Sequence, residues 1–206
     1  MFYFNFKSEV IILLIGITGK SGSGKSTITK FFKELDTTIQ IVDIDKIGHN
    51  SYSDPNVRKK LIQYFGKQIL NDDLSINRKA LSNIVFNDNT KMQKLYKSTR
   101  DYMENSIDNL INNSTITILD YALLPKLKQF NLCDIKILVT APFSNRSKRV
   151  ITRDNISLEK YNEINSNSLS YTEDDFDFII QNNYDIESLR KVIGEIYENH
   201  IVSGKF

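Results

Sequence analysis

The sequence predicts an α/β fold, a doubly wound parallel sheet of about five strands with helices on both faces. Short apolar and β-branched runs alternate with helix-like segments along most of the 206 residues, as in parallel sheets joined by crossover helices. The first run, residues 10–17, leads directly into a glycine-rich stretch, and a helix-like segment, residues 27–35, follows it. Two later strand-like runs end in aspartates, at the sheet edge where ligands of such folds bind.

The glycine-rich stretch from Gly19 to Ser26 has the G-x-x-x-x-G-K-[ST] spacing of a phosphate-binding loop, or P-loop. Its glycines let backbone N–H groups face phosphates, and the following helix adds the positive end of its dipole. We expect Lys25 to reach the β- and γ-phosphates of a nucleotide, and the Ser26 hydroxyl to hold Mg²⁺. The flanking strand and helix argue against an incidental glycine-rich turn. The loop residues expected to bind the nucleotide are Gly19, Gly22, Ser23, Gly24, Lys25, Ser26 and Thr27.

The remaining segments set the expected domain organisation. Predicted strands cover residues 39–45, 115–120, 135–140 and 178–180, and predicted helices cover residues 56–65, 78–86, 90–112, 144–154, 157–166 and 186–199. Residues 46–113 contain no convincing parallel strand, so we expect a helical insertion there that is large enough to bind a phosphate acceptor. The expected arrangement is one domain, residues 1–206, with a core of about 10–45, 114–142 and 176–200, the insertion at about 46–113 and a lid at about 143–168.

Aspartates at strand ends are candidates for the chemistry, because the carboxyl ends of parallel strands line the ligand crevice. Asp43 and Asp45 end the second predicted strand, and we expect them to point to opposite sides of it, so that one carboxylate enters the site. That carboxylate would align an acceptor hydroxyl and receive its proton late in a loose transition state, unless both acids only bond loop amides. Asp120 ends the third strand, where it would hold Mg²⁺ directly or through water, unless it is an ordinary loop cap.

A basic helix-like segment, residues 144–154, follows the fourth strand. Arg149 and Arg153 are four residues apart and therefore share one helical face. Guanidinium groups match phosphate oxygens and stabilise charge that moves during phosphoryl transfer, so this pair suits a mobile lid over ATP. The alternative is a charged face turned to solvent. Because a P-loop precedes the segment, we favour the lid and count both arginines among the expected ATP-binding residues.

Composition and charge exclude several classes of protein. The net charge of +2 is too small and too dispersed to indicate binding to nucleic acid or to an anionic membrane. The single Cys133 excludes an internal disulfide and suits a reducing compartment. Residues 1–17 are apolar, but they run into the P-loop without a cleavage-site pattern and are too short to span a membrane. We therefore expect a cytoplasmic protein, as a monomer or a weak homo-oligomer.

The order of the motifs carries a family resemblance. The P-loop follows Thr18, a D-x-D pair ends in Asp45, an F-G-x-x-[IL]-L element starts at Phe65, and a strand ends in Asn182. An R-x-x-x-R-[DN] pattern begins at Arg149. Over about residues 10–197, this combination resembles the dephospho-CoA kinase family.

The resemblance implies a P-loop NTPase-type kinase that uses ATP and Mg²⁺. Its reaction would be the transfer of the γ-phosphate of ATP to the ribose 3′-hydroxyl of dephospho-CoA, which forms coenzyme A and ADP. The resemblance makes Asp45 the acid that aligns the acceptor, with Lys25 and Arg149 as catalytic contacts to the phosphate. The acceptor-binding residues that it implies are Asp45, Arg78 and Arg100.

Two segments depart from the family pattern, and both belong to the acceptor side. Arg100 and Asp101 stand where the family usually has a His-Pro pair. Residues 122–126 replace a P-L-L-x-E element and lack its proline and its glutamate at those positions. Two alternatives therefore stay open: another P-loop kinase that acts on a nucleoside, a nucleotide or a different small molecule, and a catalytically impaired nucleotide-binding homologue.

Overall fold

The computed structural model of the chain describes residues 12–85, 88–111, 115–183 and 185–203. The strands are β1 (Leu13–Thr18), β2 (Gln40–Asp43), β3 (Ile116–Asp120), β4 (Ile135–Thr140) and β5 (Phe178–Gln181). The α-helices are α1 (Lys25–Leu35), α2 (Ile44–Asn50), α3 (Pro55–Phe65), α4 (Arg78–Val85), α5 (Asn89–Ile111), α6 (Phe143–Asp154), α7 (Leu158–Ser166) and α8 (Ile186–Ile196). Short 3₁₀ turns connect several of them, and a π-helical turn, Tyr197–Val202, follows α8.

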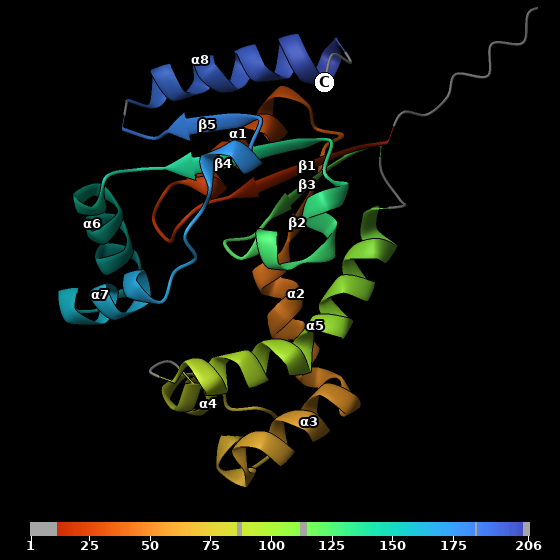
Figure 1. Cartoon of the computed structure of the whole chain (residues 1–206), viewed down its shortest axis with the longest axis vertical. Helices are drawn as coiled ribbons and strands as arrows, with labels where there is room; N and C mark the ends of the chain where they lie inside the picture. The colour runs from red at the N-terminus through yellow and green to blue at the C-terminus, as the bar shows by residue number, and fades with distance from the viewer. Residues whose placement is uncertain (1–11, 86–87, 112–114, 184, 204–206) are drawn as a thin grey trace, which may run out of the picture.

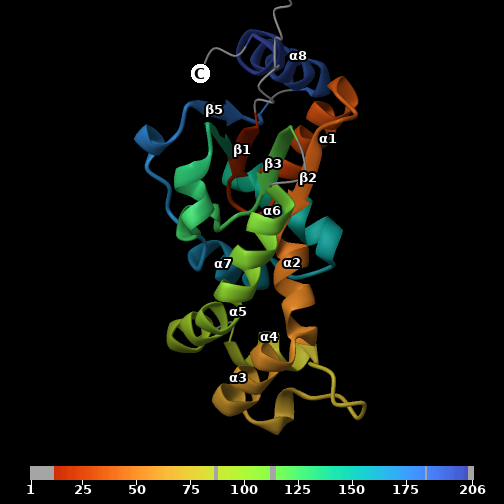
Figure 2. The same cartoon turned by 90° about the vertical axis from the view of Figure 1, so that its right-hand side faces the viewer.

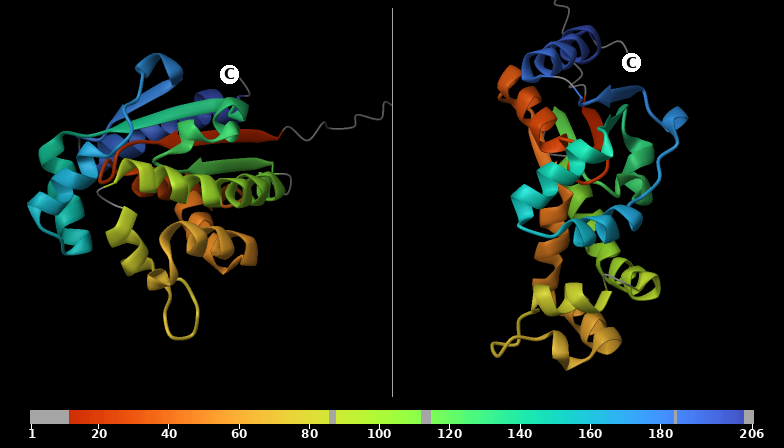
Figure 3. Two further views of the ribbon diagram at one scale, coloured as in Figure 1. Left: turned by 60° about the horizontal axis from the view of Figure 1, so that its bottom comes forward. Right: turned by 90° about the vertical axis from the view of Figure 1, so that its left-hand side faces the viewer.

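The five strands form one parallel sheet in the order β2-β3-β1-β4-β5 (Figure 1). This confirms the predicted α/β fold and its strand number. The central strand β1 is buried at all six positions, as expected for a parallel strand that is covered on both faces. All strands end at the same edge of the sheet, and α6 and α7 lie beyond that edge (Figures 1 and 3).

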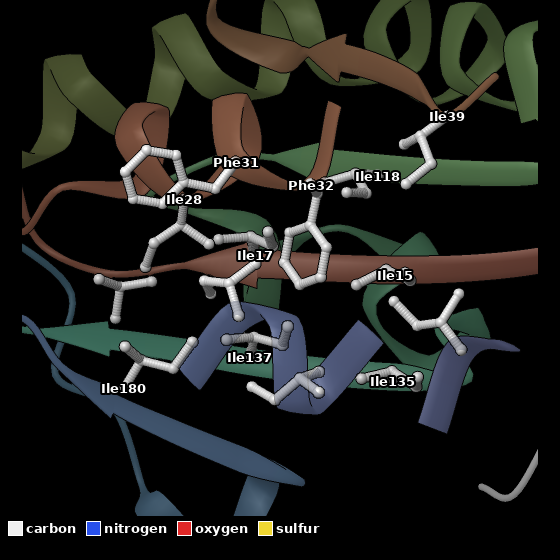
Figure 4. Packing of buried hydrophobic residues seen from close by; sticks show 14 of the residues in the cluster. Ile15, Ile17, Ile28, Phe31, Phe32, Ile39, Ile118, Ile135, Ile137 and Ile180 are labelled. Atoms are coloured by element: carbon white, nitrogen blue, oxygen red, sulfur yellow. The ribbon is translucent and has the colours of Figure 1, made fainter. Parts of the chain in front are cut away.

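Two clusters of buried side chains cover the two faces of the sheet. On one face, α1 and α8 pack against side chains such as Ile15 and Ile17 of β1 (Figure 4). On the other face, Leu14 packs with residues of α2, α5 and the segment that follows β3. Because neighbouring residues of a strand point to opposite faces, the apolar run of β1 serves both clusters. This central position fixes the loop that leaves β1.

The helices between β2 and β3 extend away from the sheet (Figures 1 and 2). The predicted helices at 56–65, 78–86 and 90–112 correspond to α3, α4 and α5, although residues 86 and 112 lie outside the described part of the chain. Asp54 caps α3 by accepting hydrogen bonds from the backbone N–H groups of Asn56 and Val57, and Gly66 ends the helix at a φ of 76°. The insertion has a buried cluster of its own, made of Val57, Leu61, Phe65, Ile69, Ile76, Leu81 and Val85.

One prediction in this region is wrong. The second strand was expected over residues 39–45, but it ends at Asp43, and the helix α2 begins at Ile44. The reason is local, because the Asp43 carboxylate accepts a hydrogen bond from the backbone N–H of Lys46, 3.0 Å away, and so caps α2. Asp45 therefore lies in the first turn of a helix.

Candidate active site

The loop between β1 and α1 wraps around the start of α1. Gly22 and Gly24 have φ angles of 80° and 103°, in the region that favours glycine. Gly24 is the residue before α1, and no side chain caps that helix. Because the first N–H groups of an α-helix have no partners within the helix, they form an anion-binding end here. The helix begins at Lys25, so that its positive end lies at the loop, as expected.

A polar cavity of about 540 Å³ lies in front of this loop. It brings together the start of α1, the carboxyl ends of β2 and β3, and one side of α6. Its lining residues are Ser21, Gly22, Gly24, Lys25, Ser26, Thr27, Asp43, Asp45, Asp120, Ala122, Arg149, Val150 and Arg153. The cavity thus brings together the expected lysine, three aspartates and the two arginines of α6, so positive and negative side chains line the same space. Gly19 and Ser23 are not among the lining residues; Ser23 is buried, and the carbonyl of Gly19 accepts a hydrogen bond from Lys25 Nζ at 3.0 Å.

Burial and charge shift the pKa values of three groups around the cavity. Burial lowers the pKa of the Lys25 ammonium, while the carboxylates of Asp120 and Asp45 act in the opposite direction. Burial raises the pKa of Asp120 to about 6, although the charge of Lys25 opposes this shift. Burial also raises the pKa of Asp45, again against the effect of Lys25. The three groups therefore interact electrostatically, and each carboxyl is a better proton acceptor than an isolated aspartate.

The raised pKa of Asp120 makes the stability of the ligand-free protein depend on pH. Between about pH 4 and pH 6 the folded state keeps a proton that an unfolded chain, with an aspartate pKa of about 3.9, releases. The free energy of unfolding should therefore fall through this range as the pH rises. Urea unfolding of the wild type and of Asp120→Asn at several pH values measures the effect, because the variant should lack this loss. Equal pH slopes in the two proteins would contradict it.

The expected orientation of Asp43 and Asp45 is also wrong. Residues two apart in a strand share a side, and Asp45 is in α2 rather than in β2. Both carboxylates line the same cavity. Their environments differ, since Asp43 accepts the capping hydrogen bond of α2, whereas the pKa of Asp45 responds to the charges of Lys25 and Arg153.

The arginines of α6 have different partners. Arg149 Nη1 donates to the carbonyl of Gly22 at 3.1 Å, so this side chain lies along the P-loop backbone. Arg153 forms a two-point ion pair with Asp154, with both N···O distances at 2.7 Å. The pair is exposed, and its contribution to stability is small. Arg153 still lines the cavity, where its charge acts on both Asp45 and Lys25.

Arg146 has a structural role that the sequence did not reveal. Its guanidinium is buried, and its Nη1 donates to the hydroxyl of Tyr161 at 2.9 Å and to Oδ1 of Asn165 at 2.8 Å. These bonds join α6 to α7. The sequence shows three arginines at positions 146, 149 and 153, but nothing in it separates the one that holds two helices together from the two that face the cavity.

A second cavity of about 180 Å³ adjoins the first one on the side of the insertion. Asp45 lines both cavities. Most other lining side chains are aromatic or apolar, and they come from α2, from the 3₁₀ turn Ser51–Ser53 that follows it, from α5 and from the segment after β3. The lining residues are Ile44, Asp45, Gly48, His49, Tyr52, Met92, Gln93, Leu95, Tyr96, Thr99, Met103, Tyr121, Leu123 and Lys126. A polar cavity suited to phosphates therefore meets an apolar one at a single carboxylate.

Comparisons with known proteins identify the family. The family model described as dephospho-CoA kinase matches residues 13–188. A dephospho-CoA kinase from Aquifex aeolicus is 32% identical over 190 residues, which cover 89% of this chain and 95% of that protein. The chain belongs to the dephospho-CoA kinase family.

Two solved structures have a similar fold. A crystal structure from Thermus thermophilus has a TM-score of 0.76 at 21% identity and covers 92% of this chain and 98% of that one. The structure titled dephospho-CoA kinase from Campylobacter jejuni has a TM-score of 0.56 at 22% identity, with 90% and 96% covered. At these identities, both comparisons show that the chain shares the fold of the two proteins. No helix in the described part of the chain is long and apolar enough to cross a membrane.

The dephospho-CoA kinase family pattern also suggested Arg78 and Arg100 as contacts to the acceptor. Arg100 Nε donates to Glu104 Oε1 at 2.8 Å, and its guanidinium lies 5.9 Å from the ring centre of Tyr96. Arg78 begins α4 and is exposed. Neither arginine lines either of the two cavities. Their role with the acceptor stays a prediction. Tyr96, which the sequence did not single out, lines the apolar cavity, and so does Lys126 of the departing segment 122–126.

Proposed function

We propose that the chain transfers the γ-phosphate of ATP to the 3′-hydroxyl of the ribose of dephospho-CoA, forming coenzyme A and ADP. The observation that carries this proposal is the position of Asp45 at the junction of the two cavities. A phosphate donor on the P-loop and an acceptor in the apolar cavity can both reach this carboxylate. Membership in the dephospho-CoA kinase family supports the choice of donor and acceptor.

The polar cavity suits the donor. The triphosphate of ATP lies along the P-loop and the start of α1, where backbone N–H groups and the Lys25 ammonium compensate its charge. Mg²⁺ would neutralise phosphate charge, and Ser26 and Asp120 are the oxygen ligands that fit it. Among the described residues, no three His, Cys, Asp or Glu side chains cluster as a metal site. A shared site, in which phosphate oxygens supply further ligands, is what Mg²⁺ typically uses.

The apolar cavity suits the acceptor. Aromatic side chains such as Tyr52, Tyr96 and Tyr121 offer flat surfaces to a nucleoside, and Lys126 adds a cation for its diphosphate. The 3′-hydroxyl is held by Asp45, whose raised pKa favours acceptance of a proton. In the transfer step, the bond between the γ-phosphorus and the β–γ bridging oxygen breaks while the bond from the 3′-oxygen to the γ-phosphorus forms. The hydroxyl proton passes to Asp45, and ADP leaves.

The lid completes the donor site. Arg153 lines the cavity, and its charge acts on Asp45 and Lys25, so it is placed to stabilise the transferring phosphate. Closure of α6 and α7 excludes water, which suppresses hydrolysis of ATP. The proposal includes a cytoplasmic location and a monomer or weak homo-oligomer. The single Cys133 fits a reducing compartment.

Measuring ADP release with ATP and Mg²⁺ tests the proposal, when dephospho-CoA is compared as the phosphate acceptor with a panel of nucleosides and nucleoside monophosphates. Dephospho-CoA should give the highest kcat/KM. Faster turnover of a nucleoside would contradict the acceptor, and ATP binding without turnover of any acceptor would favour a catalytically impaired homologue. The two departures from the family pattern make this comparison of acceptors necessary.

Gly48 offers a direct test of the apolar cavity. Gly48 lies in α2 and lines this cavity, and a Cβ at this position would contact Met103 at an ordinary 3.5 Å. In Gly48→Leu the longer side chain should occupy the cavity and raise the KM for dephospho-CoA, with the KM for ATP unchanged. Gly48→Ala is the matched control, since it adds only a methyl group and removes a helix-weakening glycine. An unchanged acceptor KM in Gly48→Leu would place the acceptor elsewhere.

A further inference from the structure

Asn182 is the first residue after the edge strand β5, and its side chain reaches the P-loop. The residue is buried, with 6% of its surface exposed. Its backbone N–H donates to the carbonyl of Thr140 at the end of β4, at 2.7 Å. Its side-chain Nδ2 donates to the carbonyl of Ser23, also at 2.7 Å, across 159 positions of sequence. One amide thus ties the end of the sheet to the phosphate-binding loop.

The bond to Ser23 fixes a peptide group that faces the phosphates. The carbonyl of Ser23 and the N–H of Gly24 belong to the same planar peptide, and in a trans peptide they point in opposite directions. Gly24 lines the donor cavity, whereas the Ser23 side chain is buried behind it. A donor that holds the Ser23 carbonyl from behind therefore holds the Gly24 N–H toward the cavity.

Arg149 of α6 contacts the same part of the P-loop and also Asn182. Its Nη1 donates to the carbonyl of Gly22 at 3.1 Å and lies 3.5 Å from that of Ser23. Its Nη2 donates to the backbone carbonyl of Asn182 at 3.4 Å. Asn182 consequently contacts both the loop that binds phosphate and the arginine that belongs to α6.

The packing around Gly24 shows how close this contact is. A Cβ added at Gly24 would collide with Nδ2 of Asn182. The same Cβ would lie 3.8 Å from Nη1 of Arg149 in α6, which is an ordinary van der Waals distance. The Asn182 amide therefore occupies the space directly behind the loop. A substitution of Asn182 should consequently alter the packing of the loop backbone.

We propose that Asn182 is a positioning residue for ATP, which orients the Gly24 N–H toward the phosphates and links Arg149 of the lid to the P-loop. The inference rests on the proposed function in taking ATP as the donor. It concerns the donor half only and does not depend on the identity of the acceptor.

Titration calorimetry with ATP and Mg²⁺, together with steady-state kinetics, tests this role. Asn182→Ala removes the donor and should weaken ATP binding about tenfold, the order expected when a buried carbonyl loses its partner. The KM for ATP should rise with it, and the KM for dephospho-CoA should not change. Asn182→Asp keeps the size but places a negative charge against the Ser23 carbonyl, so the loss of ATP affinity should be larger. The control is Asn183→Ala, since Asn183 is exposed and should leave both KM values unchanged.

A double-mutant cycle isolates the contact itself. Gly24→Ala should cost less ATP affinity in the Asn182→Ala background than in the wild type, because the colliding amide is gone. Additive costs would overturn the inference, as would wild-type ATP affinity in Asn182→Ala or an equal rise of both KM values. If Asn182→Ala does not fold, the ATP affinity of Asn182→Asp decides. Failure of the wild type to bind ATP would instead refute the proposed function.

Discussion

Lys25→Ala should lower kcat by about 10³-fold, because it removes a positive charge from the phosphates at the moment when charge moves between them. The Lys25 side chain lines the donor cavity, and burial among protein atoms lowers the pKa of its ammonium. A charge in such a place acts more strongly than one in water. Initial-rate measurements at saturating ATP and acceptor give the effect, and thermal unfolding shows whether the fold is intact.

Lys20→Ala is the matched control for this variant. Lys20 belongs to the same loop but lines a different cavity, together with Tyr171 and the end of β4. Its removal should leave kcat close to that of the wild type. A loss in Lys20→Ala as large as that in Lys25→Ala would show that the loop as a whole, and not the Lys25 ammonium, is being tested.

Asp45→Asn should reduce kcat by about 10²–10⁴-fold, the usual size of a general-base contribution, with little change in ATP affinity. Asparagine keeps the size and the hydrogen-bonding capacity of the side chain but cannot take the proton of the 3′-hydroxyl. The test combines kcat with ATP binding measured in the absence of acceptor. Collapse of ATP binding would assign Asp45 to the nucleotide or its metal ion.

Asp43→Asn supplies the comparison for Asp45. Both aspartates line the donor cavity, but Asp43 also caps α2, and asparagine is an equally good cap. Its replacement should therefore reduce kcat far less than Asp45→Asn does. If the two variants lose the same activity, the acceptor hydroxyl is not held by Asp45 alone.

The fold could be predicted largely because its signals are local. The buried run of β1 and the P-loop that follows it occupy consecutive residues, and Asp54 and Gly66 mark the ends of α3 within one short segment. The helix α2 was missed because it has only seven residues, too few to show a helical period, and because it follows β2 without a break. The capping bond from Asp43, rather than any periodicity, decides where the strand stops.

The site was predictable where strand ends meet, since parallel strands bring their carboxyl ends to one edge. Asp120 and Asp43 do end strands and line the polar cavity, whereas Asp45 also lines it but from the first turn of α2, where the strand-end argument does not apply. The apolar cavity was not predictable, because Tyr52, Tyr96 and Tyr121 come from three separate segments that only the packing of the insertion brings together. The bond from Asn182 to Ser23 was equally hidden, since no periodic pattern relates residues so far apart.

The separate buried cluster of the insertion has an evolutionary consequence. Helices α3 and α4 each pack against α5, and Tyr102 of α5 is among the side chains that pack against both this cluster and the one beneath the sheet. Substitutions among the buried residues of α3 and α4 can therefore accumulate with little effect on the sheet, whereas α5 contributes Met103 and Ile107 to the cluster beneath it. The segment with helices α3 and α4 is therefore the natural unit to exchange between relatives in a chimaera, with the junctions at Asp54 and Asn89.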